Sequence, residues 1–95
     1  MYRFSIEGQE WILRFSPQIS VGAEEKQAIL SSLLQIEKDL LAYSHGEAFM
    51  MLDKKIGAII FIVEKIPSFI LTVSTIIPTD HWYIQDPTLK LFKTC

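Results

Sequence analysis

The sequence predicts an α+β domain in which one long helix packs across one face of a mostly antiparallel sheet of four to six strands. Two observations lead to this fold class. Between residues 47 and 77, three apolar runs rich in β-branched and aromatic residues are separated by two short polar turns, which is typical of strands. Residues 23–43 instead repeat their apolar side chains with the 3.6-residue period of a helix. The expected order of elements is ββαβββ.

The chain begins with the pattern of a β-hairpin. Residues 1–6 alternate apolar and polar side chains, as expected of a strand with one buried face. Residues 7–9 contain Gly8, which tolerates the positive φ of a tight turn. Residues 10–15 alternate again, and Pro17 then ends the second strand because proline has no backbone N–H to donate.

A single amphipathic helix is expected from Ala23 to Tyr43. Its apolar stripe is broad enough to lie on a sheet, and it comprises Ile29, Leu30, Leu33, Leu34, Ile36, Leu40, Leu41 and Tyr43. Glu24 and Glu25 fall in the first turn, where the helix dipole favours negative charge. Gly46 follows the predicted end of the helix, as glycine commonly does.

Three more strands are expected after the helix, at residues 47–52, 58–63 and 69–77. The middle stretch has no polar residue, so we place it at the centre of the sheet and expect it to be covered on both faces. The connections between the three strands are short, and strands joined in this way run antiparallel. After Pro78, residues 81–84 form a candidate short edge strand, while the segment after Pro87 is amphipathic and of unassigned type.

A membrane-spanning helix is a competing interpretation of residues 56–77, because 22 residues fit the thickness of a bilayer. Glu64 and Lys65, however, fall in the middle of this segment. A charge at that depth costs roughly 2.5–3.5 kcal/mol. The abundant valine, isoleucine and threonine also favour strands. We therefore interpret the segment as two strands and a turn.

Composition limits the classes of function. All 95 residues are expected to form one domain. The net charge is −2 and only Arg3 and Arg14 are arginines, so the chain lacks the basic surplus of a nucleic-acid binder. Apolar residues make up 49% of the chain, which indicates that both sheet faces are apolar or that a partner covers one. The single cysteine, Cys95, excludes an internal disulfide. Without a secretory signal pattern, the expected location is cytoplasmic.

The two histidines, His45 and His81, are the candidate catalytic residues. If the fold brings them together, one can act as base and the other as acid in cleaving a phosphodiester. A structural role is the simpler interpretation, since His45 follows a helix and His81 stands beside Asp80 in a predicted turn. Because no histidine or cysteine spacing presets a metal site and no phosphate-binding loop is present, we expect neither a metal nor a cofactor.

Four further residues are candidates for binding. Trp82 and Tyr83 follow a Pro-Thr-Asp turn, where aromatic side chains either anchor a partner or fold back onto a small core. Thr72 and Ser74 lie on an otherwise apolar strand. They form a candidate polar patch on the sheet face away from the helix, or they serve only as good strand formers.

The order of elements, with His45 after the helix and the run Leu71-Thr72-Val73-Ser74-Thr75 late in the sheet, resembles that of small RelE-like toxins, a ribonuclease superfamily. The resemblance implies an mRNA-cleaving activity within a toxin–antitoxin or mobile-element system. It also implies that His45 is the acid or base and that Lys54, Lys55 or Lys65 contacts phosphate.

From the residues themselves we expect a small non-enzymatic protein-interaction module. It self-associates or binds a protein partner through an apolar sheet face or an edge strand. The RelE-like ribonuclease is the alternative, and a carrier of a lipid or another apolar ligand ranks third. For the interaction module, neither a membrane nor a nucleic acid is an expected partner.

Overall fold

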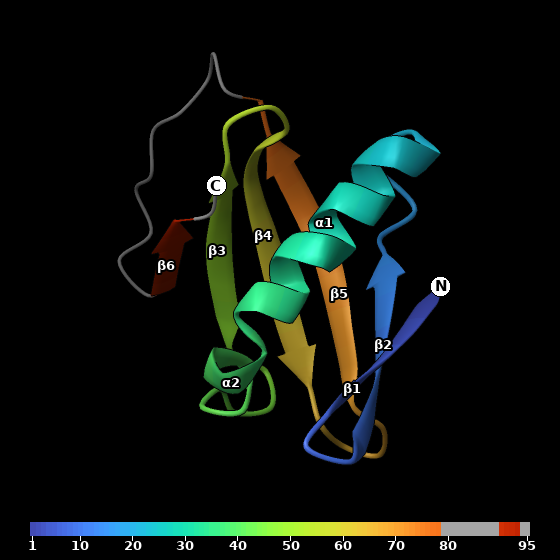
Figure 1. Cartoon of the computed structure of the whole chain (residues 1–95), viewed down its shortest axis with the longest axis vertical. Coiled ribbons are helices and arrows are strands. Elements are labelled where there is room, and N and C mark those ends of the chain that lie inside the picture. The colour runs from blue at the N-terminus through green and yellow to red at the C-terminus, as the bar shows by residue number, and fades with distance from the viewer. Residues whose placement is uncertain (79–89, 94–95) are drawn as a thin grey trace.

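The computed structural model describes residues 1–78 and the backbone of residues 90–93 and shows six strands in one sheet, with α1 lying across one face (Figure 1). The strands are β1 (Tyr2–Ile6), β2 (Gln9–Phe15), β3 (Ala48–Asp53), β4 (Gly57–Glu64), β5 (Ile70–Ile77) and β6 (Lys90–Lys93). The helices are α1 (Ala23–Gln35) and α2 (Glu37–Leu40). The predicted α+β class, with one main helix packed on a sheet, is confirmed.

The sheet is mixed, which corrects the predicted topology. Its strand order is β1-β2-β5-β4-β3-β6. The β1–β2, β3–β4 and β4–β5 pairs are antiparallel, but β2–β5 and β3–β6 are parallel. The parallel β2–β5 pair arises because the helical connection carries the chain from β2 to the far side, and β3, β4 and β5 then return towards β2. The sixth strand, β6, is absent from the predicted ββαβββ order.

The short turns expected at residues 7–9 and between residues 52 and 58 are present. Glu7 and Gly8 join β1 to β2 with φ of 49° and 83°, the pair of positive values that defines a type I′ hairpin turn. Between β3 and β4, the Asp53 carboxylate accepts the backbone N–H groups of Lys55 at 2.8 Å and Ile56 at 2.9 Å. This Asx turn ends at Gly57, which has φ of 128°.

The prediction of one unbroken helix over residues 23–43 is wrong, because α1 ends at Gln35. Ile36 has φ of −114° and ψ of 19°, and its N–H donates to the Leu33 carbonyl, three residues back. The break redirects the chain so that both Leu40 and Tyr43 are buried. The Tyr43 ring stacks on Phe49 of β3 at a centroid distance of 4.5 Å. Packing against the sheet therefore outweighs continuation of the helix.

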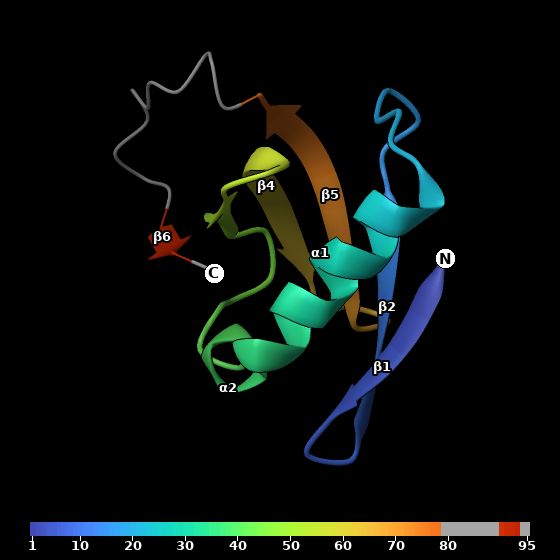
Figure 2. The same ribbon diagram turned by 45° about the horizontal axis from the view of Figure 1, so that its top comes forward.

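Figure 2 shows α1 lying over one face of the sheet, and the buried core residues come from these two layers. Trp11 and Leu13 of β2, Phe61 of β4 and Leu33 of α1 are fully buried there. Phe49 and Phe61 stack at 5.0 Å, so a row of aromatic rings crosses β3 and β4. Within the described part of the chain, neither helix has the length and apolar character needed to cross a membrane.

Candidate functional site

The sheet face turned away from α1 carries a group of isoleucines, here called the isoleucine face. Its members are Ile12 on β2, Ile60 and Ile62 on β4, and Ile70 and Ile77 on β5. The strand register places them in adjacent rows, because Ile12 is opposite Ile70 and Ile62 is opposite Thr72. The residues that alternate with them, such as Leu13 and Leu71, point to the helix and are buried.

The side chains of the isoleucine face are neither fully buried nor fully exposed. Branched side chains on strands about 4.8 Å apart shield one another from water even where no layer covers them. Met50 and Ala58, on the same face of β3 and β4, are only 1% and 2% exposed. The accessible part of the face is therefore formed by β2, β5 and the adjoining residues of β4. Residues 58–63 were predicted to be covered on both faces, whereas Ile60 and Ile62 keep partial exposure.

Arg14 lies across this face and links three strands. Its Nε donates to Thr72 Oγ1 at 2.8 Å, and its Nη2 lies 3.4 Å from Glu64 Oε1. The side chains of Arg14 and Glu64 are 45% and 36% exposed, so water screens the ion pair and its stabilisation is small. The two charges neutralise each other, so an apolar partner can approach the face without a net charge to overcome.

Thr72 and Ser74, the candidate polar patch, have different partners. Thr72 lies on the isoleucine face and accepts the hydrogen bond from Arg14. Ser74 lies at a β-bulge, where Ile60 is opposite Thr75 and Phe61 is opposite Val73. Its hydroxyl donates to the Ile60 carbonyl at 3.2 Å. Thr72 thus belongs to the surface that carries Arg14, whereas the Ser74 hydroxyl bonds the backbone of β4.

His45 is exposed in the loop after α2, and its Nδ1 accepts the Lys65 backbone N–H at 3.4 Å. The Lys65 ammonium donates to the Leu41 carbonyl at 3.2 Å and lies 5.7 Å from the centre of the Trp11 ring. These contacts attach the end of α2 to the sheet. Lys65 is one of the lysines that the RelE-like resemblance implies contact phosphate, and here its ammonium group bonds to Leu41.

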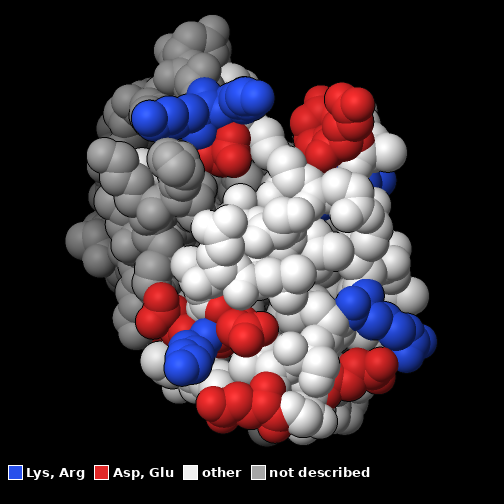
Figure 3. All heavy atoms as spheres, in the orientation of Figure 1, with Lys and Arg blue, Asp and Glu red and all other residues white. Residues whose placement is uncertain are grey.

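Lys55, another of these lysines, lines a hollow of about 320 Å³ between the start of α1 and the β3–β4 turn. The hollow is lined by Glu24, Glu25, Ala28, Asp53, Lys55 and Ile56. Figure 3 shows basic and acidic side chains on one side of a hollow at the upper end of the helix-covered face, and acidic side chains on the other side. Among the described residues that line the hollow there is neither histidine nor cysteine, and the three acidic residues, Glu24, Glu25 and Asp53, would repel a phosphate.

His81, Trp82 and Tyr83 lie outside the described residues, so their roles remain predictions. Over residues 1–78 and 90–93, no three histidine, cysteine, aspartate or glutamate side chains gather in a way that could hold a metal ion. Comparisons of the chain with protein-family models, curated proteins and solved structures gave no significant match.

Sequence reasoning missed the pairing of Arg14 with Glu64, which lies 50 residues further along the chain. Part of the signal was present, since the alternation of residues 10–15 separates Ile12 and Arg14 from the buried Trp11 and Leu13. The missing information was the parallel β2–β5 register, which sets Arg14 opposite Thr72.

Proposed function

We propose that this protein is a non-enzymatic protein-interaction module that binds a protein partner through the isoleucine face. The observation that carries the proposal is the position of Ile12, Ile62 and Ile70 in adjacent rows of one sheet face, each partly exposed. Burial of such side chains against a partner removes apolar surface from water, which is the main source of affinity in protein association.

The fitting partner element is an amphipathic helix. In this chain, α1 already covers the opposite face of the same sheet, with Ile29 and Leu33 buried against it. A helix of similar character can cover the isoleucine face in the same way. The Arg14–Glu64 pair beside it gives the polar border expected around an apolar contact.

The test is a triple variant, Ile12→Thr with Ile62→Thr and Ile70→Thr, which keeps β-branched side chains on the strands but makes the face polar. The variant and the wild-type chain are immobilised, and the proteins they retain from extracts of the producing cells are identified by mass spectrometry. A partner retained by the wild-type chain should bind the variant more weakly, by roughly tenfold for each isoleucine lost. Leu34→Ser, at an exposed apolar position of α1, is the matched control and should retain the partner.

Retention of the same partners by the folded triple variant would contradict the proposal. Arrest of cell growth on expression, relieved by His45→Ala with the fold intact, would instead favour the RelE-like ribonuclease. The two outcomes are distinguishable because His45 lies in the loop after α2 and not on the isoleucine face.

A further inference from the structure

We infer that β1 pairs with β1 of a second copy of this chain, joining the two sheets edge to edge around Phe4. The inference rests on the proposed class of function, an interaction module, but it concerns a different surface. β1 is an end strand of the sheet, at the opposite end of the strand order from β6, and it pairs with β2, which it crosses in Figures 1 and 2.

The hairpin register determines which backbone groups of β1 point outward. A two-residue turn is closed by a hydrogen-bonded pair, here Ile6 with Gln9. Such pairs alternate with non-bonded ones, so Phe4 and Tyr2 also bond to β2, whereas Arg3 and Ser5 do not. The N–H of Ile12, opposite Arg3, donates instead to Phe69 at 2.9 Å, which agrees with this assignment. The backbone groups of Arg3 and Ser5 therefore point to the open edge.

One register fits two copies best. With the two-fold axis at Phe4, Arg3 is opposite Ser5 of the second copy and all five residues of β1 take part, with four backbone hydrogen bonds. With the axis at Arg3, two arginines would face each other. With the axis at Ser5, the pairing would include Glu7, whose φ of 49° is not that of a strand.

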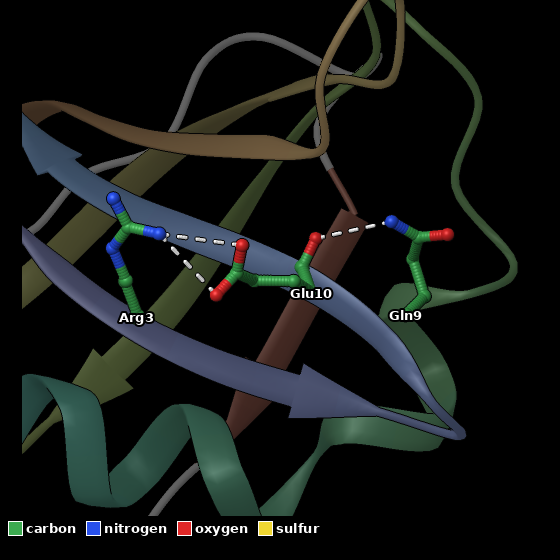
Figure 4. A network of polar contacts seen from close by, with 3 residues as sticks. All are labelled: Arg3, Gln9 and Glu10. Carbon is green, nitrogen blue, oxygen red and sulfur yellow. Dashed lines mark hydrogen bonds and ion pairs between the residues drawn. The ribbon is translucent and has the colours of Figure 1, made fainter.

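Charge complementarity supports the Phe4-centred pairing. Arg3 Nη1 lies 3.4 Å from both carboxylate oxygens of Glu10, and Figure 4 shows the two side chains directed toward each other. In the paired state, Arg3 faces Ser5 of the second copy, and that serine is opposite its own Glu10. The second Glu10 is then two strands away, about 10 Å, with only a small side chain between. Each arginine thus lies between two carboxylates.

β1 has little of what protects an edge strand against such pairing. Natural edge strands are protected by charged side chains, above all lysine, by proline or by bulges. β1 has neither lysine nor proline nor a bulge, and its one charged side chain, Arg3, is paired with Glu10 of the same chain. The β1 edge is therefore open to a second copy.

The test is sedimentation velocity over a range of protein concentrations, combined with amide hydrogen exchange of the wild-type chain measured by NMR. Five residue pairs make a small interface, so we expect a dimer with a Kd on the order of 10–100 µM. Protection of the Arg3 and Ser5 amides should increase with protein concentration, whereas Phe4 and Ile6 should be protected at every concentration.

Ser5→Pro removes the outward N–H of Ser5 and leaves the bonds between β1 and β2 intact, since proline is tolerated on an edge strand. It should weaken the dimer at least about 30-fold, because two symmetric hydrogen bonds are lost. Ser5→Thr, which keeps the N–H, should dimerise like the wild-type chain. If Ser5→Pro fails to fold, the exchange of the wild-type amides decides the question.

A chain that stays monomeric at about 1 mM would overturn this inference. So would a dimer that Ser5→Pro leaves unchanged, or one in which the Arg3 and Ser5 amides stay unprotected. None of these results would bear on binding through the isoleucine face. The triple isoleucine-to-threonine variant tests that proposed function separately. Loss of partner binding in that variant, together with an unchanged dimer, would show that the two surfaces act independently.

Discussion

Gly57 begins β4 with φ of 128°, directly beside the backbone of Ile77 on β5. A Cβ atom at this position would overlap the Ile77 carbonyl oxygen, so Gly57→Ala must both strain φ and displace β5. We expect the variant to lose about 3 kcal/mol or more of unfolding free energy in urea titrations. Gly8→Ala is the control, because its φ is 83° but no atom lies within 4 Å of the added Cβ. It should lose only about 1 kcal/mol, and equal losses would contradict the steric argument.

Tyr43 makes the protein sensitive to alkaline pH. Burial, reinforced by the negative charges of Glu47 and Asp39, raises the pKa of Tyr43 from 10.0 to about 12. The folded state thus retains the phenol proton between these two values, whereas the unfolded state releases it. This contribution to stability is present in full below pH 10.0 and is lost as pH rises towards about 12.

The measurement is the unfolding free energy of the wild-type chain and of Tyr43→Phe between pH 7 and pH 11.5. The wild-type chain should lose on the order of 1–2 kcal/mol more than the variant over the alkaline part of this range. Lysine titration affects both chains equally and cancels in the comparison. Parallel pH profiles would show that Tyr43 ionises at its ordinary pKa.

At the scale of elements, Lys65 is the residue that connects the end of α2 to the sheet. Lys65→Met keeps the aliphatic stem but removes both the hydrogen bond to Leu41 and the contact over the Trp11 ring. We expect a loss of about 1–2 kcal/mol of unfolding free energy in chemical denaturation. Lys54→Met, in the exposed β3–β4 turn, is the matched control and should change stability by less than about 0.5 kcal/mol. Similar effects of the two substitutions would argue against the connecting role of Lys65.

The individual elements could be predicted from sequence wherever local chemistry determines them. Alternation, and for residues 58–63 a continuous apolar run, located the first five strands to within two residues at each end. The turn between residues 52 and 58 is likewise local, since the Asp53 side chain bonds the backbone of its own turn. The end of α1 could not be predicted in this way. The apolar period continues through Ile36 to Tyr43, whereas in the structure the helix breaks at Ile36 and Tyr43 packs against Phe49. Periodicity indicates which residues face the core. Tertiary contacts then determine whether these residues lie on one continuous helix or on two.

At the scale of the whole molecule, strand order was the information that the sequence lacked. Short turns predict that neighbouring strands are antiparallel, but no local signal shows that β5, rather than β3, lies beside β2. The candidate site depends on that choice, because Arg14, Thr72 and Glu64 meet only in this arrangement. The residues of an apolar second face were thus predictable from composition and alternation, while their grouping into one surface required the long-range register.

The β2–β5 pairing also has a consequence for synthesis of the chain. The first hairpin is complete once residue 15 has been made, yet the strand that joins it to the rest of the sheet ends at Ile77. Until β5 leaves the ribosome, β2 has an unpaired inner edge as well as a bare apolar face. Between the synthesis of residue 15 and that of Ile77, the hairpin therefore stays open to contacts with other chains, and closure of the sheet is a non-local event.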